Sequence, residues 1–105
     1  MSEKTYNKLV RDKIPQIIEN DNKTCDIRIL DETEYLQMID LKLDEEIAEY
    51  HKEQNLEELA DVLEVVYAAS KARGYTLEEL EKTRQKKAEK RGAFENRIYL
   101  KTVQD

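Results

Sequence analysis

Two pairs of acidic residues give this chain its clearest chemical signal. Glu46 and Glu49 lie in the stretch LDEEIAEY, and Glu58 and Asp61 lie in the stretch EELADVLEVV. In a helix, residues three positions apart lie about 60° apart on one face. Each stretch therefore presents two carboxylates together, in or beside an otherwise apolar seam.

The connection between the two stretches is short, which predicts that their helices are antiparallel neighbours. Residues 46–49 then lie level with residues 58–61, and four carboxylates converge. Without a counter-charge they would repel one another and would lose hydration at a cost of several kcal/mol each. Because no basic residue lies inside either stretch, a bound cation is the simplest way to neutralise them.

An all-oxygen set of ligands favours a hard divalent ion, Mg²⁺ or Mn²⁺. Mg²⁺ often binds through a few carboxylates together with the phosphates of a substrate. A second interpretation is a helical assembly module without catalysis. In that case the acids are solvated, or they form salt bridges with Lys87, Lys90 or Arg91.

The elements that must position these acids are helices. Charged residues make up 40% of the chain, and there are only two glycines and one proline. This composition favours helices and is poor in turn-forming residues. With 105 residues, the chain is expected to form a single all-α domain over residues 1–105.

Capping and stop signals predict the helix boundaries. We expect a short helix with Asp12 as N-cap and Pro15 in its first turn, ending near Asn20, and then a long helix capped by Asp31 or Thr33 and ending near Lys52. A second long helix should run from about Leu56 to Arg73 and stop at Gly74. A last helix should be capped by Thr76, with Glu79 completing a capping box, and end at Gly92.

Two stretches outside these helices carry apolar residues. Residues 26–30, DIRIL, alternate with period two and fit either a short extended segment or a stretch lying across the bundle. In the C-terminal tail, Phe94, Ile98, Tyr99 and Leu100 are expected to pack back onto the body. The expected fold is a bundle of about four helices with a tight central hairpin, completed by oligomerisation.

Charge and cysteine content limit the partners and the compartment. The net charge of −6 argues against a general nucleic-acid binder, which needs a basic surface. No stretch approaches the roughly 18 apolar residues of a membrane span, so no membrane partner is expected. Cys25 is the only cysteine, which excludes an internal disulfide and favours a reducing compartment. We therefore expect a cytoplasmic protein.

The acidic stretches also resemble a known family. EEIAE at 45–49 and ELAD at 58–61 resemble the EExxE and ExxD motifs of the all-α nucleotide pyrophosphohydrolases, the MazG and phosphoribosyl-ATP pyrophosphohydrolase superfamily. YNKLVRDKIP and KKAEKRGAFENRIYL resemble the opening and closing segments of its small, single-domain, phosphoribosyl-ATP pyrophosphohydrolase-like branch. The ordered set spans nearly the whole chain. One departure is Ala93, where a second glycine is expected after Gly92.

This resemblance implies a Mg²⁺-dependent enzyme that cleaves between the α and β phosphates of a nucleoside triphosphate or related nucleotide, releasing pyrophosphate and a monophosphate. An alternative is the phosphoribosyl-ATP pyrophosphohydrolase of histidine biosynthesis. The resemblance implies a homo-dimer or homo-tetramer. It assigns catalysis to Glu45 and Glu46, with Glu45 orienting water, and it assigns the metal ligands to Glu46, Glu49, Glu58 and Asp61.

Phosphate charge that the ion leaves unmatched needs basic side chains. Lys87 and Arg91 stand four residues apart in a basic stretch of the last expected helix, and Lys8 and Arg11 form a second basic group near the N-terminus. The planar fork of arginine suits phosphate especially well. These four residues are the candidate substrate-binding residues.

Overall fold

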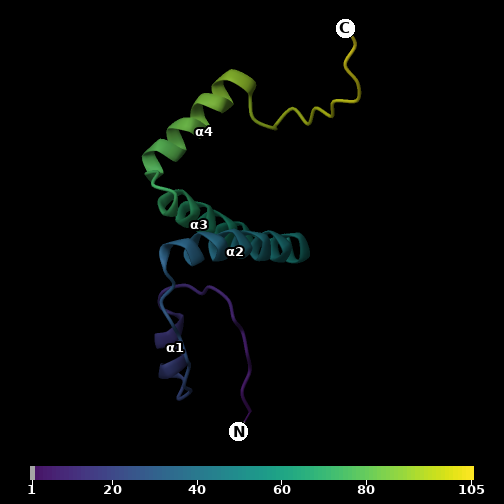
Figure 1. Ribbon diagram of the computed structural model, residues 1–105. Coiled ribbons are helices and arrows are strands. Elements are labelled where there is room, and N and C mark those ends of the chain that lie inside the picture. Colours follow the sequence, from purple (N-terminus) through teal and green to yellow (C-terminus); the bar gives the residue numbers. More distant parts are fainter. Residues whose placement is uncertain (1) are drawn as a thin grey trace.

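The computed structural model describes residues 2–105, and all of the regular structure in this range is helical (Figure 1). The all-α class and the number of helices predicted from the sequence are both confirmed. The helices are α1 (Ile14–Asn20), α2 (Glu32–Glu53), α3 (Leu56–Ala72) and α4 (Leu77–Arg91).

The centre of the fold is a hairpin of α2 and α3, which lie side by side (Figure 1). Gln54 ends α2 in the left-handed conformation, with a φ of 51°, and Asn55 caps α3 by accepting a hydrogen bond from the backbone N–H of Glu58. Ile39 of α2 and Val65 of α3 are buried, at 3% and 9% exposure. The predicted pairing of the two acidic helices is therefore confirmed.

Local signals in the sequence set most of the helix ends. The Asp31 side chain accepts a hydrogen bond from the backbone N–H of Glu34 at the start of α2. Thr76 and Glu79 form a capping box at the start of α4, and Gly92 follows its end with a φ of 84°. These caps occur where the sequence predicts them, because each depends only on residues a few positions apart.

Two predictions near the N-terminal end are corrected. The N-cap of α1 is Lys13 rather than Asp12, and no side chain makes the capping hydrogen bond. Pro15 does lie in the first turn, where its missing N–H costs little. Residues 26–30 form no strand. Ile27 is 58% exposed and Ile29 is 88% exposed, so the alternative in which this stretch lies across the bundle is wrong.

The C-terminal tail does not pack back onto the body, so this expectation is wrong. Its apolar side chains are almost fully exposed: Phe94 by 95%, Ile98 by 83%, Tyr99 by 85% and Leu100 by 73%. The reason is topological. Helix α4 starts at the end of the hairpin opposite the α2–α3 turn and leads away from it, so the tail that follows meets no apolar surface (Figure 1).

Among the described residues, no helix is long and apolar enough to cross a membrane.

Candidate metal centre

Three of the predicted ligands come together in the hairpin. Glu46 of α2 and Glu58 and Asp61 of α3 each offer a carboxylate oxygen, and these oxygens all lie within 4.8 Å of one another. All three residues are half-buried. The hairpin turn explains this arrangement, because it sets the end of α2 level with the start of α3, and the three-residue spacing keeps Glu58 and Asp61 on one face.

Glu49 lies outside this group and is exposed. It has the same three-residue spacing from Glu46 that Asp61 has from Glu58, so helical spacing alone does not decide which acids join the cluster. It is nevertheless close enough to act on the cluster electrostatically, because its charge helps to raise the pKa of Glu58. Its role as a fourth ligand stays a prediction.

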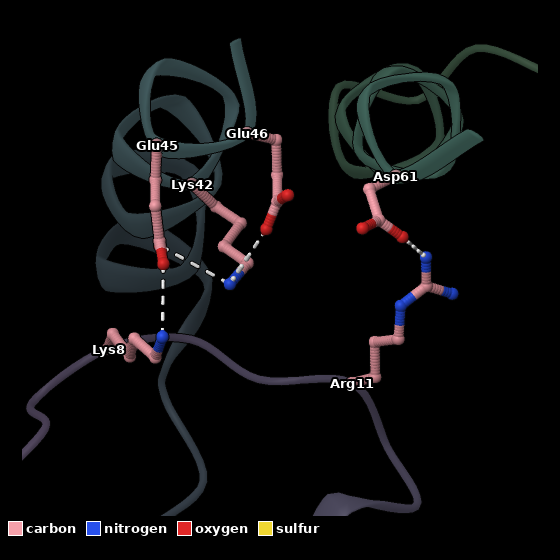
Figure 2. Close-up of polar contacts among 6 residues, drawn as sticks. All are labelled: Lys8, Arg11, Lys42, Glu45, Glu46 and Asp61. Carbon is pink, nitrogen blue, oxygen red and sulfur yellow. Dashed lines mark hydrogen bonds and ion pairs between the residues drawn. The ribbon is translucent and has the colours of Figure 1, made fainter. Parts of the chain in front are cut away.

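Lys42 is part of the site, which the sequence analysis missed. Its Nζ lies 3.2 Å from Oε1 of Glu46 and 3.3 Å from Oε2 of Glu45 (Figure 2). Only 15% of its side chain and 13% of that of Glu46 are exposed. A basic residue just outside the acidic stretch thus supplies part of the counter-charge that the sequence analysis assigned to a bound cation. The available signal was the spacing: Lys42 and Glu46 stand four residues apart, where helical side chains meet.

Glu45 faces the N-terminal segment rather than the other three carboxylates. It accepts hydrogen bonds from Nζ of Lys8 at 3.0 Å and from Nζ of Lys42 at 3.3 Å (Figure 2). Partial burial acts to raise the pKa of Glu45, but the bonds from the two lysines outweigh it and lower that pKa below its ordinary value. The same bond raises the pKa of Lys8. Glu45 is thus firmly ionised at neutral pH.

Arg11 reaches the cluster from a distant part of the chain. Its Nη2 lies 2.6 Å from Oδ1 of Asp61, and the two residues are 50 positions apart (Figure 2). The N-terminal segment passes beneath the hairpin, with Lys8 on the α2 side and Arg11 on the α3 side (Figure 2). Both residues are candidate phosphate binders from the sequence, and the structure places them at carboxylates.

Of the three carboxylates in the cluster, only that of Glu58 forms no ion pair with a basic side chain among residues 2–105. Loss of hydration and repulsion by Asp61, Glu49 and Glu46 raise its pKa above the ordinary value of 4.5. Two basic side chains, Lys42 and Arg11, therefore neutralise the cluster only in part. This residual repulsion and the all-oxygen donor set fit a hard divalent ion.

The second basic group does not reach the cluster within one chain. Lys87 and Arg91 are exposed on α4, and neither forms an ion pair in the described part of the molecule. Helix α3 carries the chain from the cluster to the other end of the hairpin before α4 begins (Figure 1).

Comparisons with known proteins give one short similarity. No protein family matches the chain, and neither does any solved structure. An uncharacterized protein of Mycolicibacterium smegmatis (strain ATCC 700084 / mc(2)155) is 51% identical over 41 residues, which make up 39% of this chain and 42% of that protein. The chain thus spans less than half the length of this relative.

Proposed function

We propose that the protein is a Mg²⁺-dependent nucleotide pyrophosphohydrolase that cleaves the α–β phosphate bond of a nucleoside triphosphate or related nucleotide. The observation that carries this proposal is the meeting of Glu46, Glu58 and Asp61 within 4.8 Å, with Glu58 still unneutralised. The ordered resemblance of the acidic stretches to the EExxE and ExxD motifs supports the same assignment.

The three carboxylates would hold the ion, with Mg²⁺ as the first choice and Mn²⁺ as the second. When bound, such an ion neutralises phosphate oxygens and lowers the pKa of a coordinated water. Glu45 stands beside Glu46 on α2 and is kept ionised by Lys8 and Lys42, so it can orient a water molecule through a hydrogen bond. Its lowered pKa makes it a better orienting group than a proton acceptor.

Basic side chains at the same site support a phosphate-bearing substrate. Lys8 and Arg11 hold their cationic groups at the edge of the cluster, where the phosphates of a bound nucleotide would approach. The hollow beside Lys8 measures only about 110 Å³ and is lined by the N-terminal segment and α2. Sites for small molecules usually occupy about 300–1,000 Å³.

A pocket of that size at the metal centre would need residues from a second chain. We therefore propose a homo-dimer or homo-tetramer as the active form. In such an assembly, Lys87 and Arg91 of one copy can lie beside the carboxylates of another copy. There they would bind the phosphates of the substrate, which they cannot do at the carboxylates of their own chain.

One observation favours a second candidate function, a helical assembly module without catalysis. Arg11 and Lys42 already form ion pairs with Asp61 and Glu46, so the acids have a structural use without any ion. The two candidates differ in their response to metal. A structural network predicts the same melting temperature with Mg²⁺ and with a chelator, whereas a metal site at a hundredfold excess of ion over Kd gains about 2.7 kcal/mol.

The deciding experiment combines a thermal-shift measurement in Mg²⁺ or chelator with a pyrophosphate-release assay. The assay panel should contain ordinary, deoxy and damaged nucleoside triphosphates together with phosphoribosyl-ATP. Glu46→Gln and Asp61→Asn are expected to abolish both the stabilisation by Mg²⁺ and the release of pyrophosphate. Glu64→Gln, an exposed carboxylate of α3 outside the cluster, is the matched control. A flat thermal response together with no cleavage of any substrate would reject the enzyme.

A further inference from the structure

The N-terminal segment, residues 8–11, bridges the two helices of the metal centre. Lys8 binds Glu45 on α2 and Arg11 binds Asp61 on α3 (Figure 2). Both contacts are long-range, since 37 and 50 residues separate the partners. The segment is thus attached to the hairpin by charges that the acidic residues of the centre supply.

Arg11 and a divalent ion would compete for the same carboxylate. Asp61 belongs to the group of three oxygens within 4.8 Å, and the guanidinium of Arg11 already lies 2.6 Å from its Oδ1. A positive charge at this distance repels a cation bound to the same group. The side chain of Arg11 is 55% exposed, so it can move into water at a small cost.

Lys42 differs from Arg11 in this respect. Only 15% of its side chain is exposed, and its partners Glu45 and Glu46 lie one turn away on its own helix. Lys42 is therefore a fixed part of the site. Arg11, held by a single partner on another element, is the counter-charge that can leave.

We propose that Arg11 is a displaceable counter-ion of the metal centre. In the ion-free protein Arg11 pairs with Asp61. Binding of a divalent ion breaks this ion pair and makes residues 8–11 more mobile. This regulation rests on the metal site of the proposed function. Coupling between two sites is reciprocal, so whatever holds Arg11 on Asp61 also weakens ion binding. Once released, the guanidinium stays tethered beside the centre, where its fork can take a phosphate.

The first test is calorimetric titration of the folded protein with MgCl₂, repeated with MnCl₂. Arg11→Gln removes the competing charge and is expected to tighten ion binding by about threefold to tenfold. This factor corresponds to the strength of one charged hydrogen bond at an exposed or partly buried position. Arg28→Gln is the matched control, because Nη2 of Arg28 also lies 2.6 Å from a carboxylate, that of Glu34, and is similarly exposed. It is expected to leave the affinity for either ion unchanged.

The second test uses the wild-type protein and does not depend on any variant folding. In nuclear magnetic resonance spectra, the side-chain N–H signals of Arg11 should move toward those of a solvated arginine as MgCl₂ is added. The corresponding signals of Arg28 should stay in place. The backbone amides of residues 8–11 should exchange faster with solvent in the presence of the ion.

The outcomes separate this inference from the proposed function. If the ion binds wild type and Arg11→Gln equally well and the Arg11 signals stay in place, the exchange of counter-ions is wrong while the metal site stands. If neither protein binds either ion, both the metal site and the exchange are rejected. Tighter binding by Arg11→Gln together with a shift of the Arg11 signals supports the proposal.

Discussion

At the scale of single residues, the proposed metal centre is a balance between carboxylate repulsion and basic counter-charges. Lys42 and Arg11 each neutralise one acid, Glu46 and Asp61, while Glu58 has no basic partner in the described part of the chain. A site that binds a cation must keep some repulsion in its ion-free state, because full neutralisation would remove the electrostatic attraction for the ion. Glu58 supplies this unmatched charge.

Replacing Glu58 should increase the stability of the ion-free protein and at the same time weaken metal binding. Burial and neighbouring acids raise the pKa of Glu58 above 4.5 in the folded protein. The folded state therefore binds the proton more tightly than the unfolded state, and this contribution to stability is present below pH 4.5 and lost as pH rises through the folded pKa. At pH 7 in chelator, Glu58→Gln is expected to raise the melting temperature, and Mg²⁺ should no longer raise it further.

The control for this variant is Glu57→Gln. Both acids lie in the first turn of α3, so both replacements lose the same favourable interaction with the helix N-terminus, but Glu57 lies outside the cluster. Glu57→Gln should therefore leave the melting temperature unchanged or lower it, and the response to Mg²⁺ should persist. Thermal melts from pH 4 to pH 8 check the sign. A Glu58→Gln protein that is less stable than wild type at pH 7 would contradict the repulsive role of Glu58.

How far the site could be predicted depends on the separation of its residues along the chain. The convergence of Glu46, Glu58 and Asp61 follows from helical spacing and one short turn, and the sequence predicts it. Lys42 was predictable from its spacing of four to Glu46. The contact of Arg11 with Asp61 was not, because it joins residues 50 positions apart and depends on the path of an irregular segment.

At the scale of elements, the first turns of α3 position two of the three carboxylates of the cluster. Asn55 accepts a hydrogen bond from the backbone N–H of Glu58, which fixes the first turn of the helix that carries two of the three carboxylates. At α4, Thr76 makes the equivalent bond with the backbone N–H of Glu79, far from the cluster along the chain. The two caps have the same local chemistry, but only Asn55 caps the helix that carries Glu58 and Asp61.

These caps give a matched pair of variants. Asn55→Ala and Thr76→Ala should each lower the free energy of unfolding by about 1 kcal/mol, the usual cost of losing an N-cap side chain. Asn55→Ala alone is expected to weaken Mg²⁺ binding, because fraying of the first turn moves Glu58 relative to Glu46. Urea unfolding measures the first effect and calorimetric titration the second. Equal Mg²⁺ affinity in the two variants would show that the cap does not position the site.

The helices themselves were largely predictable, and their packing was only partly so. Caps such as Asp31 and Thr76 are local, and the boundaries of α2 and α4 follow from them. Packing depends on surfaces that meet from far along the chain. The tail carrying Phe94 and Leu100 was expected to pack back because it is apolar, but in a single chain α4 leads it away from the hairpin.

At the scale of the whole molecule, one chain is less compact and exposes more surface than a typical domain of its length and mass. The Cα radius of gyration is 18.5 Å, whereas a compact domain of this length measures about 13 Å. The accessible surface is 10170 Å², against roughly 6,200 Å² for a compact protein of this mass. Permanent interfaces bury roughly 2,000–5,000 Å² counted over both partners, so an excess of roughly 4,000 Å² on each chain is more than enough surface for one.

An apolar stripe on α3 is the surface on which we expect a second copy to pack. Leu56, Leu59 and Leu63 recur at spacings of three and four, so they share one face, and they are 81%, 46% and 48% exposed. Covering such a face stabilises an assembly by about 25 cal/mol for each Å² of apolar surface removed from water. The double variant Leu59→Glu, Leu63→Glu is therefore expected to shift a homo-dimer or homo-tetramer to monomer in analytical ultracentrifugation.

The matched control is Gln16→Glu, which adds negative charge at an exposed polar position of α1 and should leave the assembly intact. If Lys87 and Arg91 act on the carboxylates of another copy, dissociation should also abolish nucleotide cleavage. It should spare the calorimetric binding of Mg²⁺, because Glu46, Glu58 and Asp61 all belong to one chain. A wild-type protein that sediments as a monomer at every concentration would contradict the assembly and, with it, any role of α4 at the metal centre.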